Sequence, residues 1–89
     1  YTIIEKNCWI GPNVVLTNAK YPKHPKVKEN LNGVYIQQNV KIGANTTLLP
    51  GVVIGKHSLI GAGSVVTKNV AARMIVAGSP AKEIRKVDY

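Results

Sequence analysis

Aliphatic residues recur at every sixth position along most of this chain. They fall in two stretches, one before and one after a polar segment: Ile4, Ile10 and Leu16, then Ile36, Ile42, Leu48, Ile54, Ile60 and Val66. An α-helix repeats near 3.6 residues and a plain strand near 2, so neither explains a strict period of six. The period is typical of a solenoid in which each unit is one short strand followed by a turn.

A second position of the repeat, four residues after each aliphatic, is small or β-branched. This series is Cys8, Val14, Val40, Thr46, Val52, Ser58, Ser64 and Val70, and Lys20 is its exception. We expect the aliphatic and the small side chain of each unit to point inward. Glycine often follows the aliphatic, as at Gly11, Gly43, Gly55 and Gly61, and there we expect it to permit a turn with positive φ.

The step from Leu16 to Ile36 is 20 residues, which is one regular step of six plus 14 inserted residues. We therefore predict a β-helix over 1–70 with an inserted loop at about 18–34. Pro22 and Pro25 support the loop, because proline lacks the N–H that a strand ladder needs. For the C-terminal tail, 71–89, we predict a turn at Gly78-Ser79-Pro80 and a short helix over 81–87.

Composition limits the chain to one small domain. It has 89 residues, 45% of them hydrophobic and 18% charged, as in soluble globular proteins. The net charge of +8 favours polyanionic partners or phosphate-bearing cofactors. Cys8 is the single cysteine, which excludes an internal disulfide and favours a reducing compartment, so we expect a cytoplasmic protein. Because a solenoid cut at Tyr1 would leave an open strand edge, we expect further coils or a cap before it.

Two longer runs carry a family resemblance. IGANTTLLPGVVIGKHSLIGAGSVVTKNV over 42–70 and VAGSPAKEI over 76–84 resemble the C-terminal half of the hexapeptide-repeat acyltransferases. That family folds as left-handed parallel β-helices with three hexapeptides per triangular coil, forms trimers and transfers acetyl or similar groups from acyl-CoA. The resemblance therefore implies an all-β, left-handed parallel β-helix, a homotrimer, and acetyl-CoA as the co-substrate without a metal.

The resemblance also implies a place for acetyl-CoA. Its pantetheine would lie in a groove between two subunits, against the backbone of the glycine-containing turns, where larger side chains would block the approach. The matching residues are Gly43, Ala44, Gly61 and Ala62. The phosphates of CoA would meet cationic side chains, for which Lys68, Arg73, Lys82 and Arg85 are the candidates.

The acceptor is suggested by VVLTNAKYP over 14–22. This segment resembles the N-acetyltransferases of nucleotide-linked amino sugars, which act in the biosynthesis of lipopolysaccharide and other surface glycans. In the maltose and galactoside O-acetyltransferases a comparable loop supplies a catalytic histidine, and Tyr21 stands at that position here. We expect acetylation of an amino group on a nucleotide-linked sugar, with O-acetylation of a sugar or glycan as the alternative.

Acyl transfer from a thioester needs a base for the acceptor, a donor for the oxyanion and a dry groove. His24, in Pro-Lys-His-Pro-Lys, is the candidate base, although it also suits a solvated loop. Asn18 is a candidate to orient the acceptor or to cap a turn, and Tyr21 a candidate to position substrate. We expect His57, in a turn, and Cys8, in an inward position, to be structural.

Two other classes fit less well. A hydratase resembling the γ-type carbonic anhydrases needs three imidazoles at a metal, and this chain has only His24 and His57. A scaffold or nucleic-acid-binding solenoid would use the positive charge together with exposed aromatic side chains. Trp9 and the four tyrosines form no obvious stripe, so we expect neither nucleic acid nor membrane insertion. A non-catalytic, anion-binding scaffold is the remaining alternative.

Overall fold

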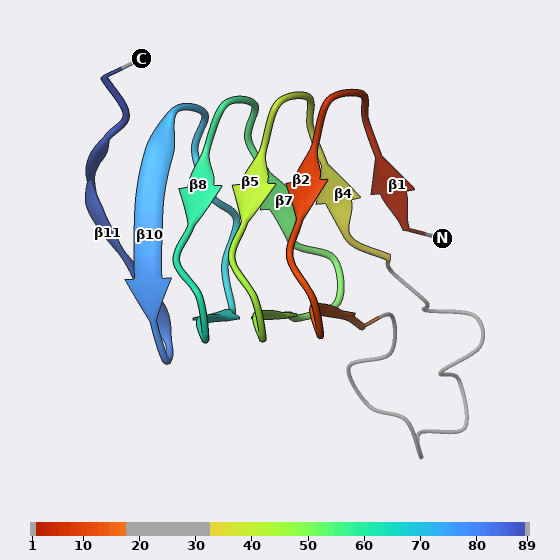
Figure 1. Cartoon of the computed structure of the whole chain (residues 1–89). Helices are drawn as coiled ribbons and strands as arrows, with labels where there is room; N and C mark the ends of the chain where they lie inside the picture. Colours follow the sequence, from red (N-terminus) through yellow and green to blue (C-terminus); the bar gives the residue numbers. More distant parts are fainter. Residues whose placement is uncertain (1, 18–32, 89) are drawn as a thin grey trace.

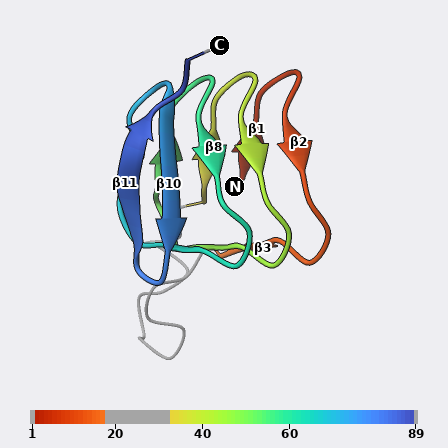
Figure 2. The same ribbon diagram turned by 60° about the vertical axis from the view of Figure 1, so that its left-hand side comes forward.

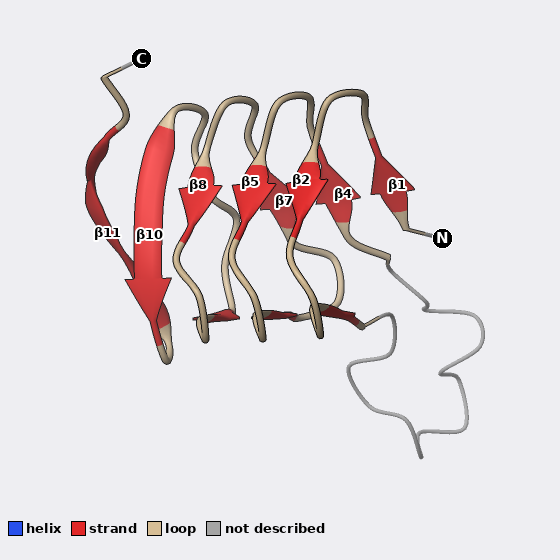
Figure 3. Cartoon of the chain, viewed as in Figure 1, coloured by secondary structure: helices blue, strands red, loops and turns tan. Residues whose placement is uncertain are grey.

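The computed structural model describes residues 2–17 and 33–88, which contain eleven β-strands and no helix (Figure 3). The first nine strands have two residues each: β1 (Ile3–Ile4), β2 (Trp9–Ile10), β3 (Val15–Leu16), β4 (Tyr35–Ile36), β5 (Lys41–Ile42), β6 (Thr47–Leu48), β7 (Val53–Ile54), β8 (Leu59–Ile60) and β9 (Val65–Val66). Two longer strands follow, β10 (Met74–Gly78) and β11 (Ala81–Lys86). Among these residues, no helix is long and apolar enough to cross a membrane.

Successive strands belong to successive sheets, so three strands complete one coil (Figure 1). The three sheets have the orders β1-β4-β7, β11-β10-β8-β5-β2 and β3-β6-β9. Ile36 pairs in parallel with Ile54, 18 residues later, which is three hexapeptides. Ile4 pairs with Ile36, 32 residues later, which is the regular 18 plus the 14 inserted residues. The predicted parallel β-helix and the length of its insertion are thus confirmed.

The predicted inward positions form the core. The aliphatic residues of the second and third coils are at most 1% exposed: Ile36, Ile42, Leu48, Ile54, Ile60 and Val66. The first coil is more open, since Ile4 is 46% exposed and Ile10 and Leu16 are half-buried. These three residues lack a further described coil to cover them.

Small polar residues also occupy the core, and each has a hydrogen-bond partner. The hydroxyls of Thr46 and Ser64 donate to the carbonyls of Gly43 and Gly61, at 2.9 and 2.6 Å. The Ser58 hydroxyl donates to the carbonyl of Ala71 at 2.7 Å. Because these bonds satisfy the hydroxyls inside the coil, the period tolerates Thr and Ser beside Val.

The reason predicted for the glycines was wrong. In the six-residue turns, positive φ falls three residues after the aliphatic, at Asn7, Asn13, Asn39, Asn45, Gly51, His57 and Gly63. The glycine directly after the aliphatic permits close packing of the coils instead. A Cβ on Gly43 would lie 2.5 Å from the Ala62 nitrogen, and one on Gly55 would lie 2.4 Å from the Ala72 nitrogen.

The predicted C-terminal helix was also wrong, because residues 81–86 form β11. In β10, Ile75 pairs in parallel with Leu59 of β8, so the tail continues the middle sheet. β11 pairs antiparallel with β10 through the predicted turn at 78–80, and the hairpin stands at one end of the solenoid (Figure 2). Once β10 has paired with β8, its free edge offers ladder hydrogen bonds to residues 81–86, and a short helix would leave these bonds unused. This tertiary pairing outweighs the local helix preference of the segment.

Candidate functional site

A column of small residues runs along one corner of the β-helix, where the β2-β5-β8 sheet turns into the β3-β6-β9 sheet. We call Gly43, Ala44, Gly61 and Ala62 the glycine–alanine column. The Gly43 N–H donates to the Ile60 carbonyl at 2.8 Å, and the Ala44 carbonyl accepts from the Gly63 N–H at 2.8 Å. The N–H groups of Ala44 and Ala62 donate to no described residue. The column therefore combines backbone N–H groups that have no partner among the described residues with small side chains, two features that suit an extended polar ligand.

A cavity of about 350 Å³ lies at the C-terminal end of the β-helix. Its lining combines apolar side chains, two lysines, an amide and a carboxylate: Val66, Lys68, Asn69, Val70, Val76, Ala81, Lys82 and Glu83. The turn at 78–80 follows the column, because the Gly78 N–H donates to the Ser64 hydroxyl at 3.2 Å. Ala81 and Lys82 come directly after this turn. The cavity thus brings two predicted phosphate-binding residues together at this end of the β-helix: Lys82, which follows the turn beyond the column, and Lys68, at the corner after β9.

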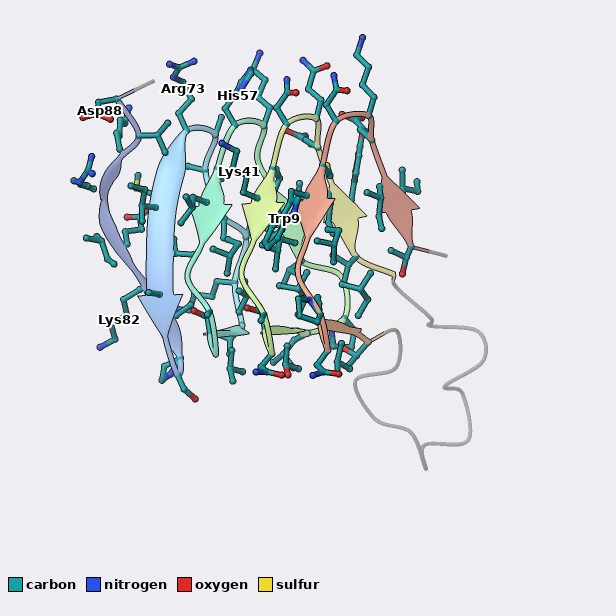
Figure 4. All side chains as sticks on the ribbon, viewed as in Figure 1. Trp9, Lys41, His57, Arg73, Lys82 and Asp88 are labelled. Carbon is teal, nitrogen blue, oxygen red and sulfur yellow. The ribbon has the colours of Figure 1, made fainter. Side chains whose placement is uncertain are left out.

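The other two predicted phosphate-binding residues do not line this cavity. Arg73 is at a different corner, where its N–H donates to the Lys56 carbonyl at 2.8 Å. Figure 4 shows Arg73 beside His57 along one edge of the solenoid, with Lys82 at the opposite edge. Arg85 lies on β11, where its guanidinium donates to the Lys86 carbonyl at 3.1 Å and lies 3.8 Å from the Asp88 carboxylate.

Sequence reasoning missed two residues of the cavity. Asn69 also lines it and is held in place, because its side-chain oxygen accepts from the Val53 N–H at 2.8 Å. Glu83 adds a carboxylate to the same wall. Each is the neighbour in sequence of a predicted lysine, so adjacency to Lys68 and Lys82 was the available signal.

The predicted acceptor residues Asn18, Tyr21 and His24 lie outside the described residues. The described chain stops at Thr17, whose hydroxyl donates to the Leu48 carbonyl at 2.8 Å, and resumes at Gly33. Both ends belong to the corner that follows β3 and precedes β4. The roles of these three residues stay predictions.

The two residues expected to be structural have local hydrogen bonds that suit this role. His57 occupies a turn position with φ of 62°, and its N–H donates to the Gln38 carbonyl at 3.1 Å. The Cys8 thiol packs against the core and donates to the Gln37 carbonyl at 3.1 Å. Across residues 2–17 and 33–88, no group of three or more His, Cys, Asp or Glu side chains is placed to hold a metal ion.

Two family models match the chain. The bacterial transferase hexapeptide model, described as six repeats, matches residues 33–68, and the model of the hexapeptide repeat of succinyl-transferase matches residues 1–17. With the period and the coils described above, these matches place the chain in the hexapeptide-repeat transferase family, and its fold is the left-handed parallel β-helix.

Similar proteins are acetyltransferases by name. The galactoside O-acetyltransferase of Escherichia coli is 39% identical over 93 residues, covering 99% of this chain and 46% of that protein. The 2,3,4,5-tetrahydropyridine-2,6-dicarboxylate N-acetyltransferase of Clostridium perfringens is 55% identical over 53 residues, covering 60% of this chain and 22% of that protein. A solved galactoside acetyltransferase in complex with coenzyme A is 37% identical with a TM-score of 0.81, covering 98% of this chain and 46% of that one. The chain spans less than half the length of these relatives.

Proposed function

We propose that this chain is part of an acetyl-CoA-dependent acetyltransferase. The observation that carries the proposal is the glycine–alanine column with the cavity of Lys68 and Lys82 at its end. The polar groups of an extended pantetheine match backbone N–H groups such as those of Ala44 and Ala62, and ammonium groups suit phosphate oxygens. The similar galactoside acetyltransferase in complex with coenzyme A supports this choice of ligand.

The reaction in this proposal is direct acetyl transfer. The acceptor oxygen or nitrogen bonds to the thioester carbonyl carbon, the carbon–sulfur bond breaks, and the acceptor proton passes to a base and then to the departing thiolate. His24 is the proposed base, Asn18 orients the acceptor and Tyr21 positions it. A positioned base of this kind contributes about 10²- to 10⁴-fold to the rate.

A sugar is the proposed acceptor, and two positions on it are open to acetylation. The galactoside O-acetyltransferase, which matches 99% of the chain, favours a hydroxyl group. The N-acetyltransferase, which is 55% identical over its matched 53 residues, favours an amino group. If the acceptor group is an amine, we propose that it belongs to a nucleotide-linked sugar, as expected from VVLTNAKYP. The enzyme would then act in glycan biosynthesis.

We further propose that the enzyme is a cytoplasmic homotrimer whose subunits complete the groove for each other. Several outward side chains of the first two coils are apolar and exposed, among them Ile3 (55%), Val15 (51%) and Tyr35 (36%). Such surface is typical of association. Light scattering of the purified protein measures the oligomeric state, and a monomer at all concentrations would contradict this part.

The test is a free-thiol assay with acetyl-CoA and a panel of acceptors, namely nucleotide-linked amino sugars, simple amino sugars and neutral glycosides. We expect CoA release that depends on an acceptor. Removal of both ammonium groups in Lys68→Gln/Lys82→Gln should raise the KM for acetyl-CoA at least tenfold, because a hydrogen bond to a charged group contributes about 1.5–3 kcal/mol. Lys56→Gln removes a charge that is also exposed, at a different corner, and should leave this KM unchanged. The proposal fails if acetyl-CoA neither binds nor turns over with any acceptor.

A further inference from the structure

The only tryptophan of the chain is largely exposed on the surface of the first coil. Trp9 lies on β2 with 58% of its surface accessible. In the parallel ladder its neighbour is Lys41 of β5, which is also exposed. Figure 4 shows the Trp9 ring between β2 and β5, on the same sheet as Lys41. An aromatic ring beside a cation can bind a ligand through stacking on the ring and through pairing with the charge.

This pair borders the glycine–alanine column. Trp9 and Lys41 each precede a corner glycine, Gly11 or Gly43, by two residues, which in a strand is about 6–7 Å. The two corners pack tightly, since a Cβ on Gly11 would lie 2.8 Å from the Ala44 nitrogen. A ligand that follows the column to Ala44 therefore reaches the outer face that holds Trp9 and Lys41.

The direction of the bound CoA follows from the position of the cavity. The lysines of the cavity follow the third coil in sequence and lie at the C-terminal end of the β-helix. With the phosphates there, the pantetheine passes Ala62 first and Ala44 next, one coil or about 4.8 Å nearer the N-terminal end. The thioester then faces the first coil. The acceptor must be held at that end, where Trp9 is the more exposed of the two exposed aromatic residues that the structure describes, at 58% against 36% for Tyr35.

We propose that Trp9 and Lys41 form an acceptor subsite for a sugar ring that carries a phosphate. The indole offers a flat apolar surface for the carbon–hydrogen face of the ring, and the ammonium group of Lys41 pairs with the phosphate. The inference rests on the proposed function and narrows its substrate class to phosphorylated sugars. Sugar 1-phosphates and nucleotide-linked sugars share this chemistry, and the assay below distinguishes them.

The kinetic test uses the full protein with glucosamine 1-phosphate, UDP-glucosamine and a neutral methyl glucosaminide as acceptors. In Lys41→Gln we expect the KM for the phosphorylated acceptors to rise about tenfold and the KM for the neutral one to stay the same. In Trp9→Leu we expect the KM to rise about 3- to 10-fold for all three, from the loss of stacking. The phosphorylated acceptor that loses more in Lys41→Gln identifies the source of the phosphate. The KM for acetyl-CoA should change less than twofold in both variants.

Two matched variants control for general effects of substitution. Ile84→Ala shortens an exposed apolar side chain on β11, at the other end of the β-helix, and Lys56→Gln removes an exposed cation from another corner. Neither should change an acceptor KM. Wild-type acceptor KM values in Trp9→Leu and Lys41→Gln would overturn the subsite. A rise only in the KM for acetyl-CoA would also overturn the subsite, because it would assign this face to CoA. Dissociation of the oligomer in light scattering would overturn it too, because it would assign the face to contact with a second copy of the chain.

A binding measurement separates this inference from the proposed function. Titration with glucosamine 1-phosphate or UDP-glucosamine should change the fluorescence of Trp9 in the wild type, and should change it only weakly in Lys41→Gln. If fluorescence responds in this way but no acceptor releases CoA, the proposed function fails and the sugar phosphate site stands. If CoA is released normally and the fluorescence does not respond to either ligand, the subsite is refuted and the proposed acetyltransferase function is retained.

Discussion

Gly43→Ala is expected to destabilise the β-helix although it adds a single methyl group. The added Cβ would lie 2.5 Å from the Ala62 nitrogen, 2.7 Å from its Cα and 3.1 Å from its Cβ. Two of these three atoms belong to the backbone of the next coil. That backbone is held by the ladder, in which the Gly43 N–H itself donates to the Ile60 carbonyl at 2.8 Å. The coils must therefore move apart or twist to accept the methyl group.

The size of the expected loss in unfolding free energy follows from the fact that the added methyl group meets backbone atoms. Overpacking a core typically costs about 1–3 kcal/mol, and a contact with backbone that cannot rotate away belongs at the upper end. Alanine recovers about 0.4–1 kcal/mol by restricting the unfolded chain. We expect a net loss of about 2–2.6 kcal/mol. For a domain of this size this loss lowers the Tm by about 10–20 °C.

The assay is thermal unfolding followed by circular dichroism, at one fixed protein concentration and without CoA. Gly63→Asn is the matched control, because a Cβ on Gly63 meets nothing within 4 Å and Asn45 adopts a similar positive φ one coil earlier. The control should change the Tm by only a few degrees. Equal Tm values for the two variants would refute the conclusion that Gly43 is required for close packing of the coils.

Three further predictions concern the core, pH and catalysis. Ile54→Asp places a carboxylate at a position with 0% exposure and should abolish folding; a soluble variant with cooperative melting would show that the inward face is misassigned. The hydrogen bond from the Tyr35 hydroxyl to the Glu5 carboxylate, with the negative charge of Glu5, raises the pKa of Tyr35 above 10.0. The stabilisation from this bond is therefore present below pH 10.0 and is lost as the pH rises through the raised pKa. Glu5→Gln should lower the pKa of Tyr35, measured by absorbance titration. An unchanged pKa would exclude Glu5 as the cause. His24→Ala should lower kcat about 10²-fold or more while His57→Ala does not, and a loss under about threefold at saturating substrate would remove His24 as the base.

The six-residue period was sufficient to predict the inward face of each coil and the length of the insertion. The reason is geometric, because one aliphatic and one small residue per unit must fill the same narrow interior in every coil. The register that pairs Ile4 with Ile36 could be predicted from this period alone. Most of the β-helix could therefore be predicted from the six-residue repeat.

The hairpin and the site were harder to predict, because both depend on contacts between distant segments. Residues 81–86 suit a helix locally and form β11 because β10 extends the sheet at β8. Lys68 and Lys82 line one cavity and Arg73 lies at another corner, a division that charge in the sequence does not reveal. The positions of Asn18, Tyr21 and His24 add nothing to this comparison, since they lie outside the described residues.

The most direct test of the central claim is a crystal structure of the protein with CoA. The account predicts that the pantetheine lies along the glycine–alanine column, with its amide oxygens facing the N–H groups of Ala44 or Ala62. The phosphates should contact Lys68 and Lys82, and the thiol should point toward the first coil. CoA bound at the corner of Arg73, or along the column with its thiol at the cavity, would contradict the assignment of the groove and its direction.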